Sequence, residues 1–277
     1  MSGTLYIVAT PIGNLDDLSP RARQTLADVD LIAAEDTRHT GRLLSHIGAK
    51  TPQKALHDHN ESDAVPAIID TLLAGKNVAL ASDAGTPLVS DPGYRLVKAA
   101  HENGIAVSPI PGPSAALAAL SSAGLPTDRF AFEGFLPSKA MARAQALTAL
   151  SNEQRTLIFF ESVHRVADVV DDMIDAFGKD RPAFIGRELS KLHEQCVSST
   201  LGELARDIGE SIAEKGEFVL VVGGAPQAES SIDADALLTE LLTALPGKQA
   251  VAITAKICGG NRNAIYERML ELRGNSS

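Results

Sequence analysis

The stretch that decides the fold is a twelve-residue loop, Ser82-Asp83-Ala84-Gly85-Thr86-Pro87-Leu88-Val89-Ser90-Asp91-Pro92-Gly93. It follows an apolar run at residues 78–81 and precedes an amphipathic segment that starts near Tyr94. Its prolines fix the backbone direction, its glycines allow unusual dihedral angles, and its aspartates display carboxylates beside bare amides. Simple strand-to-helix connections are only about 2–6 residues long. The loop therefore indicates a functional site rather than a plain turn.

Apolar runs with strand character recur outward from this loop, at residues 5–9, 31–34, 78–81 and 107–110. Helical periodicity lies between most of them. Ser19-Pro20 is typical of a capped helix start, and a second helix is expected over 63–74, with Pro66 early in it and Gly75 ending it. This alternation predicts an α/β fold with a largely buried sheet.

A second set of strand-like runs follows, at residues 130–134, 156–161, 182–186 and 217–222. Residues 225–232 resemble a linker, and helices are expected at 233–244, 248–258 and 262–272. At 277 residues the chain exceeds the usual size of one domain, roughly 100–200 residues. We therefore expect an N-terminal α/β domain at 1–113, a second α/β domain at 114–225 and a C-terminal helical segment at 226–277.

The composition restricts the classes of protein. The net charge is −10, which argues against a general nucleic-acid coat protein but leaves room for a local basic patch. Residues 247–277 contain five basic and two acidic residues, which weakly indicates an anionic partner. No apolar run approaches the roughly 18 residues that span a bilayer, and the N-terminus lacks the features of a secretory signal, so a cytoplasmic location and no membrane are expected. Cys196 and Cys258 lack metal or disulfide spacing and are expected to be buried.

Four unusual loops follow the first strands: residues 10–15, 35–38, 82–93 and 111–115. In a parallel sheet they gather at the carboxyl edge, where ligands of open α/β sheets bind, so they should frame one crevice. Neither a GxGxxG fingerprint in the first βα unit nor a GxxxxGK[ST] loop is present. The expected ligand is therefore not held through a phosphate.

Other polar clusters leave alternatives open. His57-Asp58-His59-Asn60-Glu61 has residue types that suit zinc or iron, but a polar loop capped by Ser62 or Asp63 is simpler, and hydrogen bonding to substrate is the more plausible functional use. His164-Arg165 and Arg187-Glu188-Leu189-Ser190-Lys191 are either solvated helix starts or parts of a site. Ser114 has no identifiable base, which argues against a hydrolase triad.

Taken together, several of these motifs resemble those of the tetrapyrrole methylase superfamily, in its branch that methylates small-subunit ribosomal RNA. The resemblance covers about residues 4–224 and is carried by Ala9-Thr10-Pro11-Ile12-Gly13-Asn14-Leu15, Ala34-Glu35-Asp36-Thr37-Arg38, His59-Asn60-Glu61, the 82–93 loop, residues 111–115, Gly124-Leu125-Pro126, Phe132-Glu133-Gly134-Phe135-Leu136-Pro137 and Arg187-Glu188-Leu189.

The resemblance implies two α/β domains with S-adenosylmethionine in the cleft between them, and a homodimer. It also implies methyl transfer to the ribose 2′-hydroxyl of a cytidine in 16S ribosomal RNA within the small subunit, with no metal required. By position, the superfamily's cofactor contacts fall on Pro11, Asp83, Val89, Ser114, Ala115 and Phe160.

A ribose hydroxyl is a poor nucleophile, so a general base would help, and Glu35, Asp36 and His59 lie on candidate loops. The target must be an unpaired nucleotide, and the candidate substrate contacts are Arg38, Arg42, Asn60, Lys139, Arg165, Arg187 and Lys191.

Two other functions compete with this hypothesis. A tetrapyrrole C-methyltransferase typically carries a glycine-aspartate-proline loop, which here reads Ser82-Asp83-Ala84-Gly85-Thr86-Pro87 and so favours the RNA branch. A non-catalytic assembly factor would bind S-adenosylmethionine or RNA without turnover.

Overall fold

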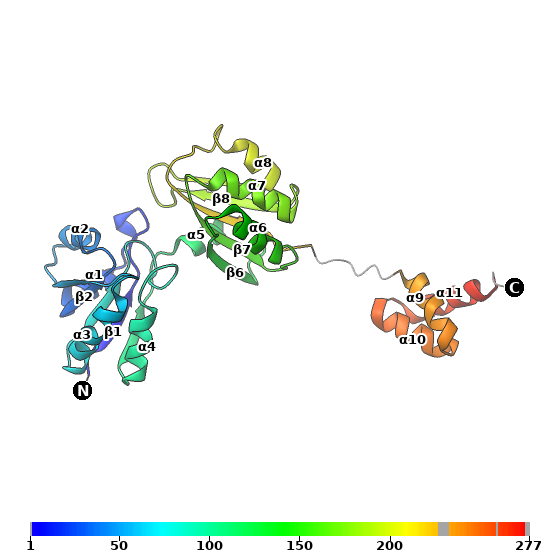
Figure 1. Cartoon of the computed structure of the whole chain (residues 1–277), viewed down its shortest axis with the longest axis horizontal. Coiled ribbons are helices and arrows are strands. Elements are labelled where there is room, and N and C mark those ends of the chain that lie inside the picture. Colours follow the sequence, from blue (N-terminus) through cyan, green and yellow to red (C-terminus); the bar gives the residue numbers. More distant parts are fainter. Residues whose placement is uncertain (1, 227–232, 259, 275–277) are drawn as a thin grey trace. The chain divides into compact units, whose positions relative to one another are not determined.

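The computed structural model describes residues 2–226, 233–258 and 260–274. The chain divides into two compact units, residues 1–225 and residues 226–277. The first unit contains two five-stranded sheets, in the blue-to-cyan and green-to-yellow parts of Figure 1, and the second is helical. Residues 227–232 of the expected linker lie outside the described residues.

The first sheet is parallel throughout and has the strand order β3-β2-β4-β1-β5. Its strands are β1 (Thr4–Val8), β2 (Leu31–Ala34), β3 (Gln53–Ala55), β4 (Val78–Ala81) and β5 (Ala106–Ile110). The central strand β4 is buried along its whole length, as expected for a parallel sheet with helices on both faces. All four predicted apolar runs are therefore strands of one sheet.

Helices cover both faces of this sheet. On one face α3 (Glu61–Leu73) and α4 (Tyr94–Glu102) share a core cluster with Leu5 and Leu80, and on the other α1 (Pro20–Asp28) and α2 (Thr37–Ile47) pack on Val8 and Ile32. The short helix η1 (Leu15–Asp17) precedes α1. The Ser19 hydroxyl accepts a hydrogen bond from the Ala22 amide, which confirms the predicted start of α1.

The second sheet is mixed and has the order β6-β7-β10-β8-β9, in which only β6 and β7 run parallel. The chain passes through α5 (Ala115–Ser122), β6 (Phe130–Phe135), α6 (Ala140–Ala149), β7 (Thr156–Ser162), α7 (Val166–Phe177), β8 (Pro182–Arg187), β9 (Gln195–Thr200), α8 (Leu201–Asp207) and β10 (Glu217–Val222).

Alternation along β7 sorts the core of this sheet into two faces. Leu157 and Phe159 pack with helices α6, α7 and α8, whereas Ile158 and Phe160 point to the face covered by α5. Successive residues of a strand point to opposite faces, so the position of Phe160 follows from the pairing of β7 with its neighbours. The α5 face is the one that carries the site described below.

Three sequence expectations need correction. The strands β3 and β9 were not predicted, because both lie at sheet edges, pair on one side only and carry polar residues. Cys196 lies on β9 and is exposed, and Cys258 is partly exposed, so neither is a buried core residue. Helix α3 begins at Glu61 with Asn60 as its N-cap, rather than at Asp63 with a cap from Ser62 or Asp63.

The C-terminal unit consists of α9 (Ala234–Ala244), α10 (Gly247–Cys258) and α11 (Arg262–Gly274), close to the predicted helices. Its small core joins Leu238, Val251 and Met269, one from each helix. The Arg268 guanidinium pairs with Asp235 at 2.7 Å and with Glu271 at 2.6 Å, so this basic side chain is already neutralised. None of the described helices is both long and apolar enough to cross a membrane.

Gly93 offers a test of how tightly the 82–93 loop is held. It has φ +124°, and a Cβ placed there would lie 2.5 Å from Leu80 Cδ2, which is buried in the core. We expect Gly93→Ala to lower the free energy of unfolding by about 2–4 kcal/mol through backbone strain and overpacking. Gly48→Ala is the matched control, because Gly48 has φ +75° with nothing near its Cβ position, and it should cost only about 1–2 kcal/mol. Urea titration of both variants measures the difference, and equal losses would contradict the expectation.

Candidate active site

The four loops after β1, β2, β4 and β5 come together at the carboxyl edge of the first sheet. The Thr10 amide donates to the Gly85 carbonyl at 2.8 Å and the Gly85 amide donates back to Thr10 at 3.0 Å. The Thr86 hydroxyl donates to the Pro113 carbonyl at 3.0 Å. These bonds join the loops after β1, β4 and β5 into one framework, as the sequence predicted.

The loop after β2 is joined to the same framework through Asp83. The Asp83 amide donates to Glu35 Oε2 at 3.1 Å, and the Asp36 amide donates to Asp83 Oδ1 at 3.1 Å. Each loop thus supplies a backbone donor to a carboxylate of the other. Charge-assisted bonds of this kind are stronger than neutral ones, and they hold Asp83 in one place.

The 82–93 loop is strained in the middle and anchored at its end. Leu88 and Ser90 have φ of +72° and +66°, a left-handed conformation that costs a residue with a side chain about 1–2 kcal/mol. Just beyond the loop, the buried Glu61 carboxylate accepts from the Arg95 amide at 2.8 Å. Strain of this kind persists where the surroundings fix it and clusters at binding sites.

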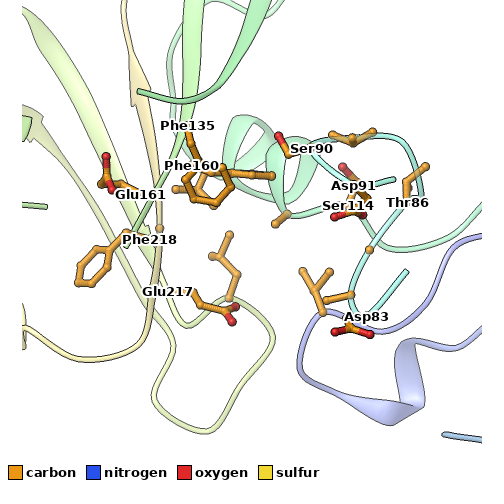
Figure 2. Close-up of a pocket in the computed structure, with 18 of the residues that line it drawn as sticks. Asp83, Thr86, Ser90, Asp91, Ser114, Phe135, Phe160, Glu161, Glu217 and Phe218 are labelled. Carbon is orange, nitrogen blue, oxygen red and sulfur yellow. The ribbon is translucent and has the colours of Figure 1, made fainter. Parts of the chain in front are cut away.

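A cavity of about 350 Å³ opens between these loops and the second sheet (Figure 2), within the range of small-molecule pockets. It is lined by Ile12, Asp83, Ala84, Gly85, Thr86, Val89, Ser90, Asp91, Ser114 and Ala115 from the first side, and by Phe135, Phe160, Glu161, Ser162, Gly186, Leu189, Glu217, Phe218 and Val219 from the second.

The lining is acidic. It contains the acidic side chains of Asp83, Asp91 and Glu217, whereas the fully buried carboxylate of the lining residue Glu161 lies on the other face of β7, and none of the described residues that line the cavity is basic. Glu161 pairs with Arg165 at 3.2 Å, and Glu217 pairs with Lys191 at 3.1 Å. Asp83 and Asp91 form no ion pair within the described part of the chain. The cavity therefore suits a ligand with a positive charge and disfavours a polyanion.

Two carboxyl groups around the cavity hold protons more tightly than usual. Burial raises the pKa of Asp91 to about 6; the Ser82 hydroxyl opposes this shift, and the nearby carboxylates of Glu35 and Asp83 add to it. Burial also raises the pKa of Glu35, although the hydrogen bond from the Asp83 amide acts to lower it. By contrast, hydrogen bonds from Arg38 hold the pKa of Asp36 well below its usual range.

Most of the predicted cofactor residues line the cavity: Asp83, Val89, Ser114, Ala115 and Phe160. Pro11 precedes the lining residue Ile12 and is not itself part of the lining. Of the candidate bases, the Glu35 carboxylate accepts from the Asp83 amide, whereas the Asp36 carboxylate caps α2 and pairs with Arg38 at 2.6 Å. His59 is exposed, and its ring lies 6.1 Å from that of His57.

The predicted substrate contacts separate into two groups. In the first group the side chains already bind within the protein. Arg165 binds the Leu136 and Pro137 carbonyls and Glu161, and Lys191 binds Glu188 and Glu217. Arg187 binds the Lys215 and His193 carbonyls and the Gln195 side chain. Asn60 likewise bonds the His57 amide and the Ala55 carbonyl.

Three predicted contacts remain open to solvent. The Arg38 side chain is 87% exposed despite its pair with Asp36, and Arg42 and Lys139 are exposed with no ion pair in the described part of the chain. Among the described residues, no group of three or more His, Cys, Asp or Glu side chains is placed to hold a metal ion.

Sequence reasoning did not select Asp91, Glu161, Glu217 or Phe135 as site residues. Asp91 belongs to the loop that opened the argument, so its residue type was a usable signal. Glu161 and Glu217 come from β7 and β10, which pair antiparallel with Glu217 opposite Ser162. Only that pairing brings the end of β10, with Glu217, beside the end of β7 at the cavity.

The raised pKa of Asp91 predicts how stability changes with pH. An unfolded Asp has a pKa near 3.9, so the stabilising effect of its proton is complete below about pH 4 and is lost as the pH rises through about 6. Asp91→Asn should therefore match the wild type near pH 4 and be more stable at pH 7, by about 1–2 kcal/mol after allowing for the partial exposure of Asp91. Urea unfolding at several pH values measures this; a constant difference across pH would refute it.

Comparison with known proteins agrees with this geometry. The family model described as Tetrapyrrole (Corrin/Porphyrin) Methylases matches residues 4–205, and that of the RsmI C-terminal HTH domain matches residues 228–273. A crystal structure of uroporphyrin-III C-methyltransferase from Thermus thermophilus, complexed with S-adenosyl homocysteine, aligns with a TM-score of 0.54 at 19% identity, over 80% of this chain and 97% of that one. This likeness concerns the fold alone.

Curated relatives are far more similar. The ribosomal RNA small subunit methyltransferase I of Pseudomonas aeruginosa is 51% identical over 99% of this chain and 99% of its own length. The protein of the same name from Escherichia coli O157:H7 is also 51% identical, over 98% of this chain and 96% of its own. The chain therefore belongs to the tetrapyrrole methylase family, in the branch of the ribosomal RNA small subunit methyltransferases I.

Proposed function

We propose that the chain uses S-adenosylmethionine to methylate the ribose 2′-hydroxyl of a cytidine in 16S ribosomal RNA within the small subunit. The observation that carries this proposal is the acidic cavity at the carboxyl edge of the first sheet, in a chain about 50% identical to ribosomal RNA methyltransferases. The proposal places the reaction in the cytoplasm and the enzyme in a homodimer.

The residues of the cavity fit the proposed cofactor. S-adenosylmethionine, when bound, supplies an electrophilic methyl group on a positively charged sulfur. Asp83 and Asp91 provide negative charge and have no ion-paired partner among the described residues, and hydroxyl and carboxylate oxygens can accept from amine and ribose groups. Val89, Leu189 and Phe160 offer apolar surface to the remaining parts of the ligand.

The same lining argues against the tetrapyrrole substrate. A tetrapyrrole with many carboxylates would meet the acidic side chains of Asp83, Asp91 and Glu217 in the cavity and no basic one among the described lining residues. Like charges at such distances repel, most strongly away from bulk water. The geometry does not distinguish the enzyme from a non-catalytic assembly factor. A measurement of turnover distinguishes them, because an assembly factor would form no product.

Among the candidate bases, Glu35 is the best suited to accept the proton of the ribose hydroxyl. Burial raises the pKa of its carboxyl, which strengthens it as a base, while Arg38 weakens Asp36 by stabilising its charged form. Glu35 is not itself part of the lining, but its carboxylate accepts from the amide of Asp83, which is. Methyl transfer also requires the ribose hydroxyl to be aligned with the methyl group, and loops held in one position favour that alignment.

RNA must meet this site through few phosphate contacts. Arg38, Arg42 and Lys139 are the predicted contacts that remain exposed. Because the chain is acidic overall and only three of the predicted contacts are exposed, counterion release should contribute little, so shape complementarity to a structured particle should supply most of the affinity.

The proposal predicts transfer of labelled methyl groups to small subunits prepared without the modification, at a single cytidine, with an alkali-resistant 2′-O-methyl product. Assembled subunits should be better substrates than naked RNA. Asp83→Asn keeps an acceptor for the Asp36 amide but loses its charge, and it should weaken S-adenosylmethionine binding about 10-fold or more. Asp70→Asn, an exposed position on α3, is the control. Cofactor binding without any product would support the assembly factor instead.

Glu35→Gln tests the proposed base separately from binding. Glutamine still accepts from the Asp83 amide but cannot take a proton at working pH. We expect kcat to fall about 100-fold or more with the Kd for S-adenosylmethionine within about twofold. Because the Glu35 pKa is raised, wild-type kcat should decline as the pH falls through it, and the variant should lose this dependence. Calorimetry and single-turnover rates check both, and an unchanged kcat would exclude Glu35.

A further inference from the structure

Phe135 is a large apolar residue left exposed at the edge of the cavity. It ends β6, lines the cavity and is nevertheless 56% exposed. Burying such a side chain normally stabilises a protein, so an exposed one at a binding site indicates that something else covers it. Figure 2 shows it beside Phe160, across the cavity from Asp83 and Asp91.

The ring of Phe135 is supported by two other aromatic rings. Its centroid lies 5.7 Å from that of Phe160 with an interplanar angle of 64°, and Phe160 lies 4.8 Å from Phe132 at 69°. These are edge-to-face arrangements, which aromatic pairs favour. Phe132 and Phe160 pack in the core on the α5 face, so Phe135 is the outer ring of an anchored cluster.

The backbone around Phe135 is also fixed. The pairing of β6 with β7 shifts register between Phe132 and Gly134, and such irregularities re-aim the next side chain. Gly134 has φ +66°, and a Cβ there would lie 3.2 Å from Ser90 Oγ, so the strained loop lies directly against this bend. The register shift is thus held in place by the same loop that lines the cofactor side of the cavity.

Arg165 fixes the other side of Phe135. Its guanidinium donates to the Leu136 carbonyl at 2.8 Å and to the Pro137 carbonyl at 3.1 Å, and it pairs with the fully buried side chain of Glu161. The backbone on both sides of Phe135 is therefore fixed. Little further entropy is lost in ordering this side chain when a ligand covers the ring.

The charge of the cavity restricts which part of an RNA can enter. Phosphates are repelled by the acidic lining, so an uncharged nucleoside must approach while its phosphates stay outside. Unpaired bases of RNA are held by stacking on aromatic side chains, and every base has a face that can stack. Lys139, exposed and four residues beyond Phe135, supplies a cation on the same segment.

We propose that Phe135 is the platform on which the base of the target nucleotide stacks when its ribose enters the site. This inference rests on the proposed function and deepens it, because it assigns the contact that holds the unpaired base. Phe135 then acts as a positioning residue for RNA and takes no part in binding the cofactor.

The test compares Phe135→Leu with Phe135→Trp in methylation of unmodified small subunits. The leucine variant should raise the KM for subunits about 10-fold or more, with the Kd for S-adenosylmethionine within about twofold. The tryptophan variant keeps an aromatic face and should restore KM to within about threefold of wild type. Phe130→Leu is the matched control: Phe130 is 41% exposed at the opposite end of β6, is not part of the lining, and its loss should leave KM unchanged.

The outcomes separate the two levels of the proposal. No incorporation by the wild-type chain would refute the proposed function and the stacking role with it. Wild-type incorporation with an unchanged KM in Phe135→Leu would refute stacking alone. Equal loss of cofactor and subunit binding in the leucine variant would show that Phe135 covers the cofactor, and failure of tryptophan to restore KM would show a purely structural role; either result overturns the inference.

Discussion

The two hydrogen bonds that join Glu35, Asp36 and Asp83 are the constraint on which the site depends. Each runs from a backbone amide to a carboxylate, at 3.1 Å, and together they tie the loop after β2 to the loop after β4. Three acidic side chains held so close repel one another, and the amide donors together with Arg38 offset part of that repulsion. Burial, with a smaller contribution from this repulsion, raises the pKa of Glu35 and of Asp91. The site is therefore electronegative by construction.

This electronegativity separates two tasks that an enzyme acting on RNA must combine. A cationic cofactor is attracted to the cavity, whereas the phosphates of the substrate are repelled by the same groups. In the proposed function, this charge favours a nucleoside that leaves its phosphates outside. Arg165 and Arg187 have their guanidinium groups committed to backbone carbonyls, so they hold the protein together rather than neutralise RNA. Contacts with RNA would then combine aromatic surface and shape with the exposed cations Arg38, Arg42 and Lys139.

The sequence predicted the parts of the fold that follow from local patterns. Eight of the ten strands in the described residues, including the four whose loops are joined at the carboxyl edge of the first sheet, have apolar runs, and the loop residues are conspicuous by type. The polar edge strands β3 and β9 carry no such pattern, since only pairing with a neighbour makes them strands. The internal hydrogen bonds of Arg187 could not be predicted either, because its partners at residues 193, 195 and 215 are brought near it only by the tertiary structure. Phe135 resembles any core phenylalanine until the register shift beside it is known.

The backbone is strained in the same way on both sides of the cavity, by residues other than glycine in the left-handed conformation. Leu88 and Ser90 on one loop, and Glu188 and Ser190 on the opposite one, all have positive φ although none is glycine. Each loop is held by an acidic anchor: Glu61 accepts from the amide of Arg95, and Glu188 accepts from the amide of Glu217 at 2.9 Å and from Lys191 at 2.8 Å. The four left-handed residues cost roughly 1–2 kcal/mol each, and relaxation of either loop would release the cost of its own two. Because the anchors prevent that relaxation, the walls of the cavity are set before any ligand arrives, and binding energy need not be spent on ordering them.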